Sequence, residues 1–243
     1  SMAFLAPDDI LVLEKNTGKV QRIVNGSLEQ NPLLQVKVGT EVELGMLGIA
    51  ISKNQQGKTF VFLYYTEADS SGIVIANRLY RYELIDNKLV NPLLLLNLPA
   101  TSPILGHENN HNGGKVVIGP DNNVYLVVGD VGGRMGNIQN IMRGSSPDGT
   151  SGILRVTQDG KSVHNGPFGS TVPNILYYAY GIRNSFGFDF DPVTGNLWDS
   201  ENGGIDKDEI NYVYPGFNSG WRKAMGMALS RFDPNEDLFY FDG

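Results

Sequence analysis

The chain of 243 residues contains no cysteine and only three histidines. Without cysteine, it forms no disulfide and offers no thiolate as a nucleophile or metal ligand. No segment keeps a helical hydrophobic period for three turns, so helix should be scarce. The longest apolar block, around 92–98, is far shorter than the roughly 20 residues that cross a bilayer. Membrane insertion is therefore not expected.

Positive charge is also in short supply. Lysine and arginine number 19 against 26 acidic residues, which gives a net charge of -7 and a pI near 4.9. The absence of a basic stripe argues against nucleic acid and anionic membranes as partners, and a neutral small substrate fits better. The first ten residues, SMAFLAPDDI, lack the charged start and apolar core of a signal peptide, and the leading Ser-Met resembles a cloning remnant.

The sequence does contain many turn residues, with 30 glycines and 12 prolines between short runs rich in Val, Ile, Leu, Tyr and Phe. This punctuation is typical of an all-β protein. The predicted strands are 10–13, 20–23, 48–51, 60–65, 78–84, 116–118, 124–128, 152–156, 187–190, 196–199 and 209–213.

A loose internal repeat connects these strands. The segments ILVLEKNTGKV from Ile10, RLYRYELIDNKLV from Arg78 and GILRVTQDGKSV from Gly152 are offset by about 68 and 74 residues. A second pair, VVIGPDNNVYLVVGD from Val116 and FDFDPVTGNLWDSEN from Phe188, is offset by about 72 residues. Repeated four-stranded units of this kind predict the blades of a β-propeller.

The segment from Asn110 to Asp130, NHNGGKVVIGPDNNVYLVVGD, carries a candidate catalytic pair. His111 stands before the predicted strand 116–118, and Asp130 follows the predicted strand 124–128. A hairpin brings the two ends of such a segment together. A neutral imidazole accepts a proton near physiological pH, and a nearby carboxylate fixes its tautomer and stabilises its charged form.

Six motifs in register resemble the glucose/sorbosone dehydrogenase family, the soluble aldose sugar dehydrogenases that use pyrroloquinoline quinone (PQQ). The motifs span most of the chain: ELGMLGIAI from 43, NHNGG from 110, YLVVGD from 125, GIRN from 181, SENGG from 200, and DEIN with GFNSGW after 208. The resemblance implies an all-β fold, a six-bladed propeller of the soluble quinoprotein glucose dehydrogenase type. It also implies oxidation of aldose sugars at the anomeric carbon to the lactone.

The resemblance assigns three catalytic residues. His111 matches the general base that takes the proton of the anomeric hydroxyl while hydride leaves for the quinone. Asp130 matches the carboxylate that orients this histidine. Arg183 matches the arginine beside the quinone oxygens, where a fixed cation stabilises developing negative charge. For an isolated GIRN motif, the alternative is that Arg183 pairs with one of the abundant carboxylates.

The resemblance also implies two cofactors, PQQ and calcium. The backbone carbonyls of Gly203 and Gly204 match the oxygens that hold calcium on the quinone, which suits a hard dication. Gly204 stands where many relatives have proline, which loosens this turn. The expected cofactor contacts, besides Arg183, are Glu43, Asn110, Asn184 and Asn202.

The length of the chain fits an incomplete propeller. With a module of about 70 residues, the chain supplies about three and a half modules, whereas propellers commonly close with four to eight. We therefore expect residues 1–243 to form a single partial domain of about three and a half to four blades, cut short at its C-terminal side. On the resemblance, the late-blade Lys and Arg residues that clamp the quinone are expected to lie beyond residue 243. Unpaired edges would favour association into a homo-oligomer.

Other interpretations stay open at this stage. One is a non-catalytic propeller that binds a sugar or protein, and another is a calcium-dependent lactonase-type hydrolase. Asp208 and Glu209 fit the bracing of a turn better than metal binding. The aromatic residues Trp198, Trp221, Tyr177, Tyr178 and Tyr180 are expected in the propeller core or rim, with sugar stacking as the alternative. An external electron acceptor and a periplasmic or extracellular location follow from the resemblance alone.

Overall fold

The chain forms sheets throughout the part that can be described. The computed structural model describes residues 1–101, 109–132, 147–163, 168–204, 208–221, 231–233 and 238–240. Within these ranges the only helical element is a 3-10 turn, Asn174–Leu176, so the all-β prediction is confirmed. The described residues contain no helix that is long and apolar enough to cross a membrane.

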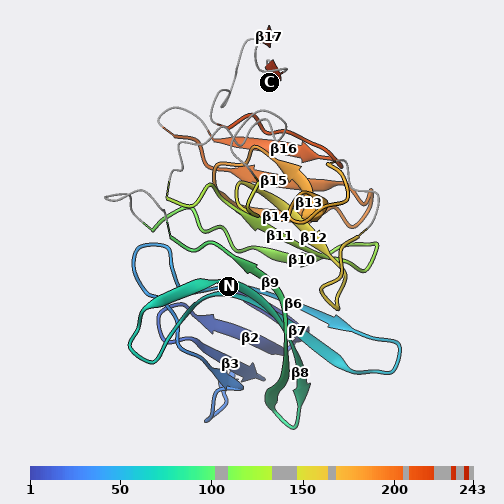
Figure 1. Cartoon of the computed structure of the whole chain (residues 1–243). Coiled ribbons are helices and arrows are strands. Elements are labelled where there is room, and N and C mark those ends of the chain that lie inside the picture. The colour runs from blue at the N-terminus through green and yellow to red at the C-terminus, as the bar shows by residue number, and fades with distance from the viewer. Residues whose placement is uncertain are drawn as a thin grey trace.

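Four sheets of three to five strands follow one another along the chain, from blue to orange in Figure 1, and a two-stranded sheet comes after them. The first contains β1 (Met2–Ala6), β2 (Asp9–Glu14), β3 (Lys19–Val24), β4 (Ser27–Leu28) and β5 (Leu34–Gln35). The second contains β6 (Met46–Lys53), β7 (Thr59–Ala68), β8 (Val74–Ile85) and β9 (Lys88–Leu98). The third contains β10 (Val116–Ile118), β11 (Val124–Val128), β12 (Gly152–Val156) and β13 (Tyr177–Tyr180). The fourth contains β14 (Ser185–Phe190), β15 (Leu197–Glu201) and β16 (Glu209–Val213), and β17 (Arg231–Asp233) pairs with β18 (Leu238–Tyr240).

The second, third and fourth sheets are antiparallel meanders in sequence order, as in propeller blades, and so is the first except that β5 pairs with β3. One repeat falls on equivalent strands, the first two of the third and fourth sheets, whereas the other falls on pairs that are not equivalent in their sheets. Val116 and Phe188 begin the repeats that form β10–β11 and β14–β15, while the other repeat forms β2–β3 and β8–β9. The third copy of that repeat, which begins at Gly152, forms β12 and a turn that ends in an isolated β-bridge between Val156 and Ser162. The arrangement is propeller-like with four sheets, whereas closure by six blades stays a prediction.

Alternation along the middle strands explains why the sheets stack. In β11, Val124, Leu126 and Val128 join the core shared with the second sheet. The intervening residues Tyr125 and Val127 join the core shared with the fourth sheet. Because successive side chains of a strand point to opposite faces, a strand that is apolar at every position can bury both. The strand β7 divides its side chains in the same way between the first and third sheets.

Most strands lie where the sequence predicts them. The longest strand that the prediction lacks is β9. The predicted strands include none there, although the repeat from Arg78 indicates a second strand after its polar turn and residues 92–98 form an apolar block. Pro92 is unusual inside a regular strand. In the structure Asn91 has a φ of 53°, and the register of β8 against β9 shifts between Arg81 and Glu83. The proline therefore lies at a bulge, where the ladder of hydrogen bonds is already interrupted. The strands β1, β4, β5, β13, β17 and β18 are further additions to the predicted set.

Candidate active site

The hairpin of the third sheet brings His111 and Asp130 together. The pairs Val116↔Leu126 and Ile118↔Val124 set the register of β10 and β11. The Nδ1 atom of His111 lies 2.5 Å from Asp130 Oδ1. The Asp130 side chain is only 1% exposed, so this contact is shielded from water. A buried carboxylate at this distance holds the imidazole in one orientation.

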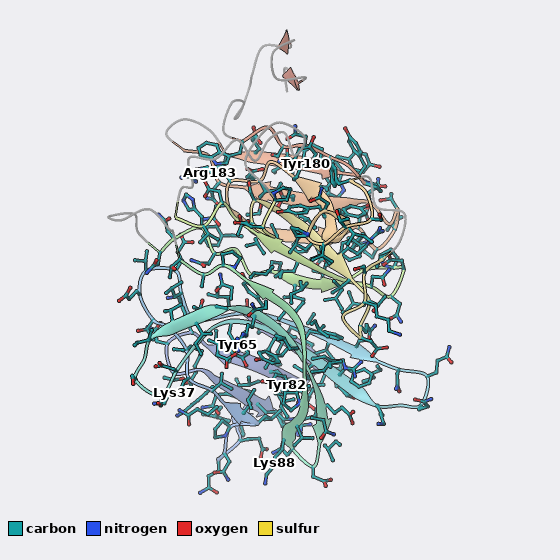
Figure 2. All side chains as sticks on the ribbon, viewed as in Figure 1. Lys37, Tyr65, Tyr82, Lys88, Tyr180 and Arg183 are labelled. Atoms are coloured by element: carbon teal, nitrogen blue, oxygen red, sulfur yellow. The ribbon has the colours of Figure 1, made fainter. Side chains whose placement is uncertain are left out.

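Arg183 lies beside this pair, on the connection between β13 and β14. Its backbone carbonyl accepts a hydrogen bond of 2.9 Å from the backbone N–H of Asp130. The guanidinium carbon is 5.3 Å from the centre of the Trp221 ring, and Trp221 Nε1 donates to Asp130 Oδ2 over 2.7 Å. Figure 2 shows Arg183 in the upper half of the molecule with Tyr180, far from Tyr65 and Tyr82 in the lower half. The three predicted catalytic side chains therefore meet in one region.

Gly129 allows this close approach of two chain segments. A methyl group added at its Cα would lie 2.4 Å from the carbonyl oxygen of His111 and 2.6 Å from that of Arg183. Both distances are far below van der Waals contact, and both neighbours are backbone atoms. Only glycine therefore fits between the segments that carry the base and the cation.

Glu43 holds the histidine segment from the loop before β6. Its Oε2 atom accepts hydrogen bonds from the backbone N–H groups of His111 at 2.6 Å and Asn112 at 3.3 Å. His111 has a φ of 58°, a left-handed conformation that is uncommon outside glycine. Glu43 thus satisfies the backbone of a strained segment. Its expected role as a cofactor contact stays a prediction.

A buried polar network that no sequence pattern indicates lies behind His111. The Asn112 side chain is fully buried, and its Oδ1 accepts a 2.6 Å hydrogen bond from Asn77 Nδ2. The Tyr64 hydroxyl donates to the Asn112 carbonyl over 3.2 Å, and Thr66 Oγ1 donates to Asn77 Oδ1 over 2.6 Å. Such satisfied networks rigidify their surroundings. The second sheet therefore anchors the segment that presents the base.

Polar atoms of the expected cofactor contacts lack partners within the described residues. These atoms are Asn110 Oδ1, Asn184 Oδ1 and Arg183 Nε, and all three are buried. Buried polar atoms without a partner are rare and call for an explanation, such as a ligand. Asn202 is close to two of these residues, since its carbonyl accepts from Arg183 Nη1 at 3.0 Å and its N–H donates to the Asn184 carbonyl at 2.8 Å. Around Arg183 and Asn184, an unpaired donor and an unpaired acceptor are therefore left for a polar ligand that both accepts and donates hydrogen bonds, and the Arg183 cation suits a ligand with negative charge.

The glycine turn predicted for calcium borders the same region. A methyl group added at Gly204 would lie 3.8 Å from the Trp221 ring and 3.9 Å from Arg183 Nε. The N–H of Gly203 donates to Asp208 Oδ1 over 2.9 Å, which agrees with the turn-bracing role expected for Asp208. Among the described residues, no group of three or more His, Asp or Glu side chains could hold a metal. Calcium would therefore depend on backbone carbonyls of this turn.

Two buried carboxyl groups lie on β15, Asp199 and Glu201, and Glu201 supports the backbone of Arg183. Glu201 Oε1 accepts a 2.5 Å hydrogen bond from the backbone N–H of Arg183, and its Oε2 accepts one from the Ser219 hydroxyl. Burial raises the pKa of Glu201 to about 8 and that of Asp199 to about 6. In the described part of the chain, no carboxylate forms an ion pair with the Arg183 guanidinium. The simple ion-pair interpretation of Arg183 therefore finds no support there.

Comparison with known proteins shows the family to which the chain belongs. A sequence model of the Glucose / Sorbosone dehydrogenase family matches residues 1–230. The chain belongs to the glucose/sorbosone dehydrogenase family. The predicted resemblance is thereby confirmed for nearly the whole chain.

The chain is also similar to two curated relatives and two solved structures. It is 29% identical to quinoprotein glucose dehydrogenase B of Acinetobacter calcoaceticus, covering 90% of this chain and 49% of that protein. It is 24% identical to the aldose sugar dehydrogenase YliI of Escherichia coli, covering 96% and 61%. The PQQ-bound aldose sugar dehydrogenase of Streptomyces coelicolor has a TM-score of 0.73 at 26% identity, covering 93% and 67%. The apo-form soluble aldose sugar dehydrogenase of Escherichia coli has a TM-score of 0.75 at 24% identity, covering 97% and 66%, and so supports the fold.

The chain spans between 49% and 61% of the length of these curated relatives. Their names support assignment to the dehydrogenases. The Streptomyces relative is a PQQ-bound form, so a protein of this fold holds that cofactor. The roles of individual site residues in the present chain stay predictions.

Sequence reasoning missed the two residues that connect the predicted site. The sequence places Trp221 in the core or rim, with sugar stacking as the alternative, and Glu201 only within a motif. Trp221 lies 91 residues from Asp130 in sequence, so no local pattern indicates their hydrogen bond. The GFNSGW motif is a signal of position in the family, but not of this contact.

Proposed function

We propose that the protein oxidises aldose sugars at the anomeric carbon to the lactone, with PQQ as the electron acceptor. The observation that carries this proposal is the contact of 2.5 Å between His111 Nδ1 and the buried carboxylate of Asp130, beside Arg183. Membership in the glucose/sorbosone dehydrogenase family supports the same class of reaction.

In the proposed reaction His111 acts as the general base. With Nδ1–H bonded to Asp130, the lone pair of Nε2 is free to accept a proton. His111 takes the proton of the anomeric hydroxyl as that oxygen becomes the carbonyl of the lactone. Asp130 keeps the ring oriented and stabilises the imidazolium. Proton transfer to a positioned base such as His111 typically accelerates a reaction by roughly 10²- to 10⁴-fold.

Arg183 provides fixed positive charge next to the base. Its side chain is held by the Asn202 carbonyl and the Trp221 ring, so the guanidinium is positioned before the reaction. A preorganised cation stabilises negative charge without reorganisation. When bound, PQQ would supply the acceptor for the hydride that leaves the anomeric carbon. Asn110, Asn184, Asn202 and Glu43 would contact it, and the carbonyls of Gly203 and Gly204 would hold calcium.

A lactonase-type hydrolase is the less favoured alternative. That reaction requires side-chain carboxylates converging on calcium, and the residues the structure describes form no such cluster. A non-catalytic propeller would not need an imidazole and a carboxylate shielded together next to a cation. We further propose an external electron acceptor and a periplasmic or extracellular location, on the resemblance alone.

Reconstitution tests the proposed function. The protein is titrated with PQQ and calcium, and aldose-dependent reduction of a dye is measured in parallel with lactone hydrolysis. We expect dye reduction that requires PQQ and an aldose, with no hydrolysis above the rate without protein. Hydrolysis without dye reduction would support the lactonase instead. PQQ binding with neither activity would support a binding protein.

A further inference from the structure

Trp221 joins the two halves of the candidate site. Its indole Nε1–H donates to Asp130 Oδ2 over 2.7 Å, while the other oxygen of the same carboxylate lies 2.5 Å from His111 Nδ1. The face of its ring lies below the Arg183 guanidinium, with 5.3 Å between the guanidinium carbon and the ring centre. A single side chain therefore touches both the partner of the base and the cation.

The position of this ring is set by its own loop. The backbone N–H of Trp221 donates to the Gly181 carbonyl over 2.9 Å, and Ser219 N–H donates to the Tyr180 carbonyl over 3.0 Å. The Ser219 hydroxyl also donates to the buried Glu201. A methyl group added at Gly181 would come within 2.2 Å of Asn218 Oδ1, so the two segments are closely apposed. The loop 216–221 is thus fastened to the segment that carries Arg183.

We propose that Trp221 is a positioning residue for both His111 and Arg183, an inference that rests on the proposed function. A carboxylate with one bonded oxygen can rotate, whereas one with a donor on each oxygen is fixed. By occupying Oδ2, the indole directs Oδ1 of Asp130 to the imidazole, which fixes the tautomer with Nε2 as the acceptor. The aromatic face holds the guanidinium by a cation–π interaction.

Loss of the indole has two separable consequences. Trp221→Phe keeps an aromatic face for Arg183 but leaves Asp130 Oδ2 as a buried acceptor without this donor. Trp221→Leu removes the aromatic face as well. The first variant should therefore disturb the base alone, and the second should disturb both the base and the cofactor contacts of Arg183.

The chain offers a matched control, because it has only two tryptophans. Trp198 is 43% exposed on the outer face of the fourth sheet, where its ring lies 5.5 Å from that of Tyr212. Trp198→Phe removes an indole of the same chemistry without touching the site. It also assigns the two indole N–H signals in an NMR spectrum.

The first arm of the test needs no activity. In ¹H–¹⁵N spectra of the protein, the Trp221 indole signal should exchange slowly with solvent and move in both Asp130→Asn and His111→Ala. The Trp198 signal should stay in place in both variants. A Trp221 signal that does not move in Asp130→Asn would overturn the inference, because the indole would then not be bonded to that carboxylate.

The second arm measures catalysis by the PQQ-loaded protein. Trp221→Phe should lower kcat for an aldose by about 10- to 100-fold, with PQQ affinity retained. Trp221→Leu should weaken PQQ binding in addition, and Trp198→Phe should match the wild type. Unchanged kcat in Trp221→Phe would overturn the positioning role. If the wild type oxidises no aldose, the proposed function fails, and the indole signal still decides whether Trp221 holds Asp130.

Discussion

Replacement of Gly129 by alanine tests whether the base and the cation share one tightly fitted site. The added methyl group would lie 2.4 Å from the His111 carbonyl oxygen and 2.6 Å from that of Arg183. Neither oxygen can turn away, because both belong to the backbone. The Arg183 carbonyl also accepts from the Asp130 N–H at 2.9 Å, and the Gly129 carbonyl accepts from Ser151 N–H at 2.8 Å. The methyl group must therefore push the two segments apart.

The size of the effect follows from overpacking. Forcing a methyl group into a filled site costs about 1–3 kcal/mol. For a chain of this length, each kcal/mol lowers Tm by roughly 2–4 °C, so the loss should be about 2–12 °C. Gly187→Ala is the matched control, since its only close neighbour is the Ser200 hydroxyl at 2.9 Å, a side-chain end that can rotate. We expect Gly187→Ala to change Tm by less than Gly129→Ala.

Thermal unfolding followed by circular dichroism measures the first effect, and aldose-dependent dye reduction measures the second. Because the displaced carbonyls belong to His111 and Arg183, turnover at a permissive temperature should fall along with stability. A Gly129→Ala protein with the Tm and turnover of the wild type would show that the two segments are not as close as described.

Three further changes test other parts of the account. Asp130→Asn should lower kcat by roughly 10²- to 10⁴-fold with PQQ affinity kept; equal kcat in steady-state assays would contradict its orienting role. Glu43→Ala leaves the N–H groups of His111 and Asn112 without their acceptor and should cost about 1–3 kcal/mol in urea unfolding, whereas Glu43→Gln keeps an acceptor and should cost less. Burial raises the pKa of Asp199 from 3.8 to about 6, so the folded state binds its proton more tightly and loses stability as pH rises from about 4 to 6. Asp199→Asn should remove that part of the pH dependence, and an unchanged slope of unfolding free energy against pH would refute this.

The sequence is most informative where local rules decide the structure. Alternating and apolar runs separated by turn residues predict β10 and β11, and the short turn between them is enough to place His111 near Asp130. The repeat with an offset of about 72 residues predicts equivalent hairpins for the same reason. Hairpin register is a local property, so it can be read from the chain.

Contacts between sheets cannot be read in this way. The bond from Trp221 to Asp130 depends on how the fourth sheet stacks on the third. The support of Arg183 by Glu201 depends on the pairing of β14 with β15 and on the loop that follows β13. A buried carboxyl group in a strand carries no signal in composition or period. The family motifs mark the positions of these residues, but only packing reveals what they touch.

The most direct test of the central claim is the rate at which an aldose reduces PQQ in a single turnover. His111→Ala protein is loaded with PQQ to the same occupancy as the wild type, so that binding is not in question. The account predicts a reduction rate lower by roughly 10²- to 10⁴-fold, because the proton of the anomeric hydroxyl loses its acceptor. An equal rate in the two proteins would contradict the assignment of His111 as the base.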